Sequence, residues 1–161
     1  MTAPNPLTIR KAVAADERHV LDLSSRMANF ELPPWRTPDE ITGADAREML
    51  EAMRSGHADS EVFIAERQGE IAGCLHMVVA SDFFGRRHAH LSVIAISEKA
   101  EGTGAGRALM EFADQWARAR SLPFITLNVF AANARARRLY ERCGYDVELL
   151  KYAKRLSPIP P

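Results

Sequence analysis

The spacing of apolar residues changes several times in the first half of this chain, and each change predicts a new element. A short apolar segment at residues 7–10 predicts a strand, and helical spacing follows from residue 15 to residue 27. A second helix is expected over about residues 44–54. Residues 62–67 and 71–80 favour two strands, and the glycine-containing turn between them makes these an antiparallel hairpin.

The second half repeats the order of strand and helix twice. Residues 91–96 (LSVIAI) predict a strand, which the sequence EGTGAGR at 101–107 separates from an amphipathic helix. Residues 124–130 predict a buried strand, and after it Asn133 can cap a helix that Gly144 ends. This order is typical of an α/β domain with helices on both faces of its sheet.

Three glycines, at positions 102, 104 and 106, stand between the predicted strand and helix. Glycine lets the backbone approach a ligand closely, and a helix that begins there directs unpaired N–H groups and the positive end of its dipole at an anion. A tight turn without a ligand is the alternative. A Walker loop is excluded because Arg107 and Ala108 follow the last glycine, where that motif has lysine and then serine or threonine. The dinucleotide fingerprint fits poorly, because the spacing is G-x-G-x-G and the next strand ends in VFAAN without an acidic residue. A nicotinamide oxidoreductase is therefore only a third alternative.

Two motifs in this order resemble the GNAT superfamily of acetyl-CoA-dependent N-acetyltransferases. They are EGTGAG at 101–106 and N-x-x-A-x-x-L-Y-E-x-x-G-Y at 133–145, and the match covers residues 91–145. The resemblance implies one α/β (α+β) domain over residues 1–161, with its core at 7–156 and short disordered termini. We expect a mixed, mostly antiparallel sheet of about six or seven strands, the last within residues 149–156, flanked by about four helices. A splayed strand pair would hold coenzyme A.

Coenzyme-binding residues follow from the resemblance by position. Backbone groups of the glycine loop would hold the pyrophosphate, and the strand before the loop would pair with the pantetheine arm. The residues so implied are Ile94, Ala95, Ile96, Glu101, Gly102, Thr103, Gly104, Ala105, Gly106, Arg107, Asn133, Ala136 and Tyr140. Glu101 departs from the family, where Arg or Gln is usual, so its side chain is expected to point away from the phosphates or to help cap the helix.

Tyr140 is the candidate general acid, because the departing coenzyme A thiolate needs a proton that a phenol can supply. An ordinary core aromatic is the alternative. Many family members carry the base as a carboxylate on the strand before the glycine loop, but that strand reads HLSVIAI here. We expect a water relay that ends at Ser92 or His90, which alternate onto one strand face. The alternative is a carboxylate from elsewhere, such as Glu31 or Asp82.

The acceptor site is expected in two loops. The proline-rich segment 29–38 holds Phe30 and Trp35, which would form an apolar wall, and Glu31, which would attract a cationic amine. Aromatics that simply plug onto the core are the alternative. The link at residues 81–87 offers Asp82 and Phe84 as a second wall.

No metal is expected. His88 and His90 have an i, i+2 spacing, but no further Cys or carboxylate follows them at ligand spacing. Cys74 and Cys143 lack C-x-x-C spacing and are expected to be reduced core thiols.

Composition narrows the classes of partner. The chain has 161 residues, of which 47% are hydrophobic, and its 21 basic and 21 acidic residues give no nucleic-acid signature. The beginning, MTAPNPLTIRK, has no apolar signal-peptide core, and no stretch approaches the roughly 18 apolar residues of a membrane helix. We therefore expect a cytoplasmic protein without nucleic-acid or membrane partners. The resemblance also allows a homodimer, built through edge strands and the C-terminal segment.

The sequence thus predicts an enzyme that moves acetyl from acetyl-CoA directly to a primary amine of a small molecule or peptide, without a covalent enzyme intermediate. The alternative is a non-catalytic coenzyme A-binding sensor or partner-binding module, because the strand carboxylate is missing.

Overall fold

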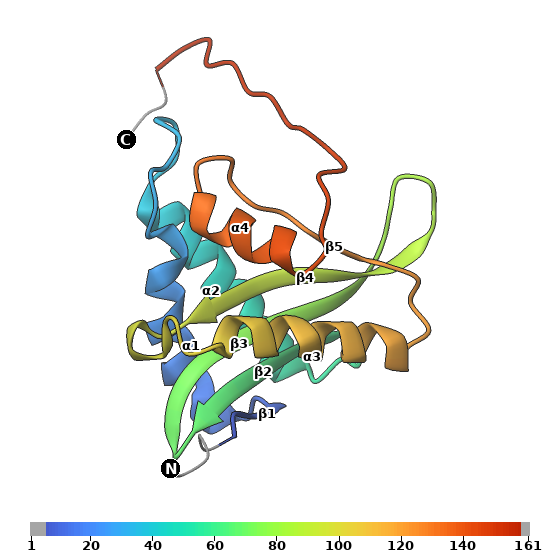
Figure 1. Ribbon diagram of the computed structural model, residues 1–161. Coiled ribbons are helices and arrows are strands. Elements are labelled where there is room, and N and C mark those ends of the chain that lie inside the picture. Colours follow the sequence, from blue (N-terminus) through green and yellow to red (C-terminus); the bar gives the residue numbers. More distant parts are fainter. Residues whose placement is uncertain (1–5, 159–161) are drawn as a thin grey trace.

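The computed structural model describes residues 6–158, and its strands form one mixed sheet in the order β1-β2-β3-β4-β5 (Figure 1). Neighbouring strands are antiparallel except β4 and β5, which are parallel. The five strands within residues 6–158 are fewer than the six or seven expected. Their bounds are β1 Thr8–Lys11, β2 Ser60–Arg67, β3 Glu70–Ser81, β4 Arg87–Ile96 and β5 Ile125–Leu127.

The α-helices of the described residues number four, as expected: α1 Glu17–Ser24, α2 Pro38–Ser55, α3 Ala105–Ala119 and α4 Ala134–Arg142. A 3₁₀ turn, η2 (Ser25–Ala28), continues α1. In contrast to the prediction, α2 begins at Pro38 rather than near residue 44. Thr37 and Glu40 form a capping box there, and Pro38 occupies the first turn, where its missing N–H costs no hydrogen bond.

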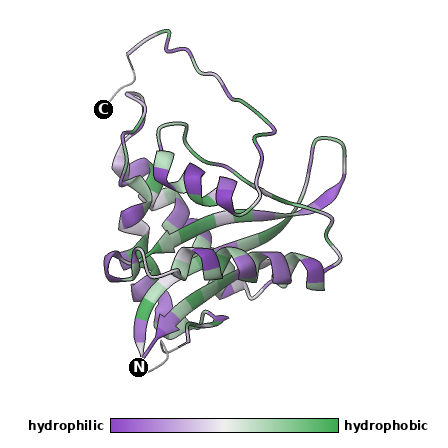
Figure 2. Cartoon of the chain, in the orientation of Figure 1, coloured by the Kyte–Doolittle hydropathy of each residue, from purple (hydrophilic) through white to green (hydrophobic). Residues whose placement is uncertain are grey.

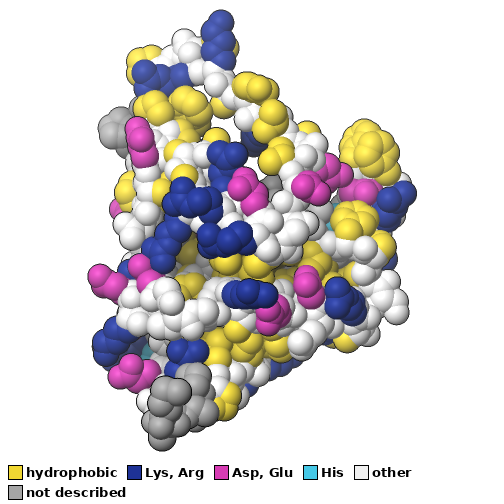
Figure 3. Space-filling model, in the orientation of Figure 1, with side chains coloured by type: hydrophobic (Ala, Val, Ile, Leu, Met, Phe, Trp, Pro, Cys, Tyr) yellow, Lys and Arg dark blue, Asp and Glu magenta, His cyan; other side chains and the backbone are white. Residues whose placement is uncertain are grey.

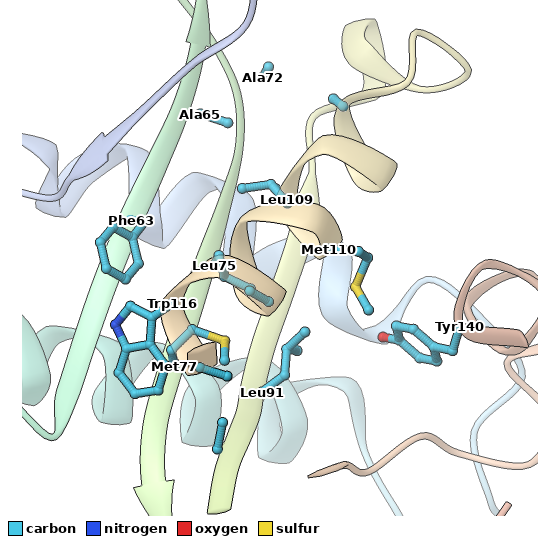
Figure 4. Close-up of a cluster of buried hydrophobic side chains, with 14 of the residues drawn as sticks. Phe63, Ala65, Ala72, Leu75, Met77, Leu91, Leu109, Met110, Trp116 and Tyr140 are labelled. Atoms are coloured by element: carbon cyan, nitrogen blue, oxygen red, sulfur yellow. The ribbon is translucent and has the colours of Figure 1, made fainter. Parts of the chain in front are cut away.

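Two hydrophobic cores lie on the two faces of the sheet. On one face, α3 packs Leu109, Met110 and Trp116 against the strands, which we call the α3-side core (Figure 4). On the other, α1 and α2 pack Val20 and Met49 against the strands, which we call the α2-side core. Figure 2 shows the sandwiched strands mostly hydrophobic and the outward surfaces of α3 and α4 largely polar. This distribution is the amphipathic pattern that the helical spacing predicts.

A β-bulge divides β4. Leu91 pairs with Met77 and Val93 pairs with His76, so Ser92 is an extra residue in β4. The bulge reverses the alternation of side chains: Leu91 belongs to the α3-side core, Val93 to the α2-side core, and Ile94 again packs against the α3-side core.

The chain parts from β4 where β5 ends, which is the place where we expected a splayed strand pair. The two strands pair only from Ala89 with Ile125 to Leu91 with Leu127. β4 continues to Ile96, and no strand of residues 6–158 lies beside this last part of β4 on the β5 side. Backbone groups of β4 are therefore available there to an extended ligand.

The segment after α4 is not the strand predicted within residues 149–156. It leaves the body of the molecule as an extended chain (Figure 1) and exposes Val147, Leu149, Leu150, Tyr152 and Leu156. Residues 1–5 and 159–161, part of the disordered ends expected from the sequence, lie outside the described residues. Within residues 6–158, no helix combines the length and the apolar character that crossing a bilayer requires.

Candidate active site

A cleft of about 1090 Å³ opens where β4 and β5 diverge. Its walls come from β4, the glycine loop with the start of α3, α4, the loop after β5, α2, η2 and the loop before α2. Segments that are far apart in the sequence thus meet at one site. The sequence-predicted residues that line it are Phe30, His90, Ser92, Ile94, Ala95, Ile96, Glu101, Gly102, Gly104, Ala105, Gly106, Arg107, Asn133, Ala136 and Tyr140.

The glycine loop forms one end of the cleft. Gly102 and Gly104 have φ values of 72° and 86°, a backbone region that residues with a side chain rarely adopt, so the loop conformation requires glycine at both. Gly104 is the N-cap of α3, and no side chain caps this helix. The first N–H groups of α3 therefore keep their capacity to bind an anion. Thr103, predicted to contact the coenzyme, lies outside the lining and donates its hydroxyl to the carbonyl of Ala100 at 2.6 Å.

Gly106 has a different role, which is close packing. A Cβ atom there would lie 3.3 Å from Cδ2 of Leu139, so Gly106 lets α3 and α4 approach each other.

Glu101 does not cap α3, and its side chain instead pairs with two arginines. Arg135 of α4 lies 2.7 Å from its carboxylate, and Arg26 of η2 hydrogen-bonds the same oxygen. Hydrogen bonds from Arg135 and then from Arg26 hold the pKa of Glu101 below its usual range. Arg26 also donates its Nε to the carbonyl of Ile96 at 2.8 Å. Glu101 thus joins η2 to α4, with its negative charge matched by two arginines.

Arginines dominate this end of the molecule. Figure 3 shows Lys and Arg side chains gathered over α4, whose sequence contributes Arg135, Arg137, Arg138 and Arg142. Arg107, Arg135 and Arg142 line the cleft itself. The glycine-loop end therefore favours a ligand with negative charges.

Tyr140 of α4 also lines the cleft. Its side chain is only 8% exposed and enters the α3-side core near Met110, with its hydroxyl directed toward the sheet (Figure 4). Within residues 6–158, no group hydrogen-bonds this hydroxyl. Burial raises the pKa of Tyr140 to about 12, so the phenol carries its proton at neutral pH.

His90 and Ser92 line the middle of the cleft from β4, and Ser92 is the bulge residue. Nδ1 of His90 lies 2.8 Å from the hydroxyl of Thr126 on β5, so one ring nitrogen is already engaged. Burial, followed by the neighbouring His88, lowers the pKa of His90, while Glu48 opposes the change. His90 is therefore neutral at neutral pH.

The far wall of the cleft is an acidic face of α2 that the sequence analysis missed. Glu40, Ile41, Ala44, Asp45 and Glu48 recur at helical spacing and line the cleft. The prediction began α2 too late to include Glu40, so this stripe was not visible. Burial, with a contribution from Glu48, raises the pKa of Asp45 to about 6.

Two aromatic residues, Phe30 and Phe130, pack against each other in the lining of the cleft. The ring centroids of Phe30 and Phe130 are 5.4 Å apart, and both residues line the cleft. Phe30 was predicted for this wall, whereas Phe130 was expected only as part of a buried strand. The chain leaves β5 at Leu127, and this early departure brings Phe130 to the cleft.

Four residues predicted for the acceptor site lie outside the cleft lining: Glu31, Trp35, Asp82 and Phe84. Asp82 accepts hydrogen bonds from the backbone N–H groups of Phe84 and Arg86, at 2.9 and 2.8 Å, and so stabilises its own turn. Phe84 is 88% exposed in that turn between β3 and β4. The structure does not bring Asp82 and Phe84 to the site because the long hairpin carries them away from it (Figure 1).

Residues 6–158 contain no group of three His, Cys, Asp or Glu side chains that could hold a metal ion. His88 stacks on Phe124 at 4.9 Å between ring centroids, and its Nδ1 lies 3.2 Å from the carbonyl of Arg86. Cys74 is buried and Cys143 half-buried, and both are free thiols.

Comparison with known proteins agrees with this geometry. Residues 25–145 match the acetyltransferase (GNAT) family. A mycothiol acetyltransferase of Acidothermus cellulolyticus is 36% identical over 94 residues, which span 52% of this chain but only 29% of that enzyme. The uncharacterized N-acetyltransferase YhfO of Bacillus subtilis is 27% identical over 141 residues, 87% of this chain and 90% of that protein. AAC(6')-Iy, solved in complex with the bisubstrate analogue CoA-S-monomethyl-acetylneamine, shares the fold with a TM-score of 0.68 at 17% identity, over 93% of this chain and 99% of its own.

The family match covers well over half of the chain and includes both motifs, the glycine loop and the α4 segment, from which the resemblance was drawn. The chain therefore belongs to the GNAT family of acetyltransferases and is an acyltransferase.

Proposed function

We propose that this protein transfers acetyl from acetyl-CoA directly to a primary amine of a small molecule or peptide, with Tyr140 as the general acid. One observation carries the proposal: a single cleft joins the uncapped start of α3 to the buried, proton-bearing Tyr140 and then to a wall of carboxylates.

The coenzyme half of the cleft suits acetyl-CoA by its chemistry. The N–H groups of residues 105–107 would receive the pyrophosphate, and Arg107 and Arg142 supply positive charge nearby. The unpaired part of β4, at Ile94 and Ile96, offers backbone groups to the amides of the pantetheine arm. The bound coenzyme A analogue named for the structural neighbour AAC(6')-Iy supports this assignment by analogy of fold.

The reaction follows from what each end of the cleft provides. The neutral amine attacks the thioester carbonyl carbon, a C–N bond forms, and the C–S bond then breaks. Tyr140 donates its proton to the departing sulfur. Burial raises the pKa of Tyr140, and it also raises the pKa of a thiol, as at Cys74. The pKa of the departing coenzyme A thiol and the pKa of the phenol should therefore shift in the same direction.

The test of the acid role is Tyr140→Phe, with Tyr145→Phe as the matched control. Tyr145 is the neighbouring tyrosine, 6.1 Å away between ring centroids, and lies outside the cleft lining. We expect kcat of Tyr140→Phe to fall at least about 100-fold while the Kd of acetyl-CoA is retained. The Tyr145→Phe variant should keep its kcat. An unchanged kcat in Tyr140→Phe would remove the general acid from the proposal.

Coenzyme identity is tested by thermal unfolding with acetyl-CoA, NADH and ATP separately, because a ligand of the native state raises the melting temperature in proportion to RT ln(1 + [L]/Kd). A rise with acetyl-CoA alone is the expected result. A larger rise with NADH would overturn it in favour of a nicotinamide enzyme. Tight acetyl-CoA binding without thiol release, for a broad panel of amines, would favour the alternative of a coenzyme-binding sensor. The observation that favours this alternative is the absence of a carboxylate on β4.

A further inference from the structure

Acetyl transfer to an amine needs a group that removes protons from nitrogen, because amines are ammonium ions at neutral pH. Strand β4 contains no carboxylate at any position from Arg87 to Ile96. His90 lies on β4, but its Nδ1 already faces the hydroxyl of Thr126. The base for the proposed reaction therefore has to be sought on the other walls of the cleft.

Asp45 is the carboxylate whose surroundings fit this task. It projects from α2 into the cleft that Tyr140 also lines. Within residues 6–158, its side chain has neither an ion-pair nor a hydrogen-bond partner, so its oxygens are free to accept a proton. Glu40, by contrast, uses one carboxylate oxygen to cap the backbone N–H of Thr37 at 2.8 Å.

Several charged or titratable groups line the same cleft as Asp45: Glu40 and Glu48 on α2, Arg36 before it, Arg26 on η2, His90 on β4 and Tyr140 on α4. Of these, Glu48 changes the proton affinity of Asp45, because its negative charge opposes a second one nearby. Burial acts in the same direction and is the larger cause, so the carboxyl titrates closer to neutral pH than an exposed aspartate.

We propose that Asp45 is the catalytic base of the proposed acetyl transfer, and that Glu48 is a positioning residue which acts through the charge of Asp45. The inference rests on the proposed function. It assigns the acceptor end to the α2 wall and implies a cationic amine as the acceptor, since carboxylates attract the ammonium form.

The protons balance as follows. The acceptor ammonium carries three protons on its nitrogen. One of these protons passes to Asp45 and then to solvent, and the resulting amine attacks the thioester carbon. A second stays on the amide nitrogen of the product. The third replaces the proton that Tyr140 gives to the coenzyme A sulfur. The C–N bond forms, the C–S bond breaks, and no oxidant or reductant is needed.

The first test is the pH profile of kcat/KM for n-butylamine, measured as thiol release from acetyl-CoA by wild type, Asp45→Asn, Glu48→Gln and His90→Gln. We expect kcat/KM of Asp45→Asn to fall at least about 100-fold near neutral pH, and its pH profile to lose the acidic limb. In Glu48→Gln the limb should move to lower pH, because the repelling charge is gone. Glu51→Gln is the control, since Glu51 lies on α2 outside the cleft lining and should leave the profile unchanged.

The second test needs no acceptor. The NMR signal of the side-chain carboxyl carbon of Asp45 is assigned by its loss in Asp45→Asn, and its shift is followed as the pH changes. In wild type the titration midpoint should lie well above the ordinary aspartate value of about 4, and in Glu48→Gln the midpoint should be lower than in wild type. Titration of Asp45 near about 4, or an unchanged midpoint in Glu48→Gln, would overturn the inference.

The outcomes also separate this inference from the proposed function. If wild type turns over acetyl-CoA while Asp45→Asn keeps both kcat/KM and the acidic limb of the pH profile, only the assignment of the base fails. Loss of the acidic limb in His90→Gln alone would instead assign the base to β4. If wild type does not bind acetyl-CoA, the proposed function fails, whatever the titration of Asp45 shows.

Discussion

At the scale of single residues, the sheet leaves no space for a side chain at Gly73. A Cβ atom there would lie 2.5 Å from the carbonyl oxygen of Ala95 and 3.3 Å from Cδ1 of Leu109. Gly73 pairs with Ile96, the last residue of β4, so its small size lets β3, β4 and α3 meet next to the glycine loop. The backbone oxygen has no freedom to move away without disturbing the strand.

We therefore expect Gly73→Ala to lower the free energy of unfolding by about 1–3 kcal/mol. Gly43→Ala is the control, because Gly43 lies within α2 and a Cβ there would meet nothing within 4 Å beyond its chain neighbours and the backbone of its own helix. This second change should stabilise the protein by about 0.5–1 kcal/mol, since alanine favours a helix over glycine. Urea unfolding measures both, and equal effects of the two variants would contradict the steric explanation.

At this scale, residues that the sequence singled out by a motif line the cleft, whereas those chosen from loops depend on tertiary position and mostly lie elsewhere. The glycine loop and Tyr140 line the cleft because their motif sets the local backbone. Asp45 has no motif, and only the packing of α2 against the rest of the cleft gives it its surroundings. Asp82, expected near the acceptor, instead binds the backbone of its own turn.

At the scale of elements, α4 depends on the residue that precedes it. Asn133 is the N-cap, and its Oδ1 accepts a hydrogen bond from the N–H of Ala136 at 3.1 Å. The helix is nine residues long and carries Tyr140, so its position sets the position of the proposed acid. Short helices gain proportionally more from a cap, because they have few internal hydrogen bonds.

Replacing the cap by Asn133→Ala should lower the free energy of unfolding by about 1 kcal/mol. It should also raise the Kd of acetyl-CoA, because α4 lines the proposed coenzyme half of the cleft. Asn133→Ser retains a capping oxygen and should behave like wild type in the melting temperature. Calorimetry with and without acetyl-CoA measures both effects, and a serine variant as unstable as the alanine variant would argue against capping.

The elements themselves were predictable wherever the apolar spacing was long and regular. The hairpin of β2 and β3, the helix α3 and the cap of α4 agree with the prediction. The start of α2 was missed because prolines at 33, 34 and 38 suggested a loop, although Pro38 sits where a helix tolerates it. The predicted last strand is not present because a strand needs a neighbour, and residues 149–156 lie beside none in the described structure.

At the scale of the whole molecule, carboxylates tie separate elements together. Asp16, only 4% exposed, accepts two hydrogen bonds from Arg10 of β1, at 2.7 and 3.0 Å. Glu17 of α1 pairs with Arg54 of α2, and Glu101 pairs with Arg135 of α4. Hydrogen bonds from these three arginines hold the pKa of each carboxyl below its usual value.

The stability of the protein should therefore fall as the medium becomes acidic. A carboxyl with a lower pKa in the folded state contributes stability above its unfolded pKa, near about 4, and loses that contribution as the pH falls through its folded pKa. We expect the urea midpoint to drop between about pH 5 and about pH 2. The drop should be shallower in Asp16→Asn, which lacks the most buried of these carboxyls; an identical slope would show that Asp16 contributes nothing to it.

The bulge at Ser92 separates two sets of positions on one strand. His90 lies before it and faces toward the proposed acceptor wall, whereas Ile94 and Ile96 lie beyond it and pack against the α3-side core beside the glycine loop. Changes in the first set should alter what enters the proposed acceptor end, and they should leave the side chains of the proposed coenzyme half untouched. Directed evolution toward new amines can therefore randomise His90 and the cleft-lining positions of α2 while the proposed coenzyme half is held constant. Such a library should keep its coenzyme affinity as its acceptor range broadens.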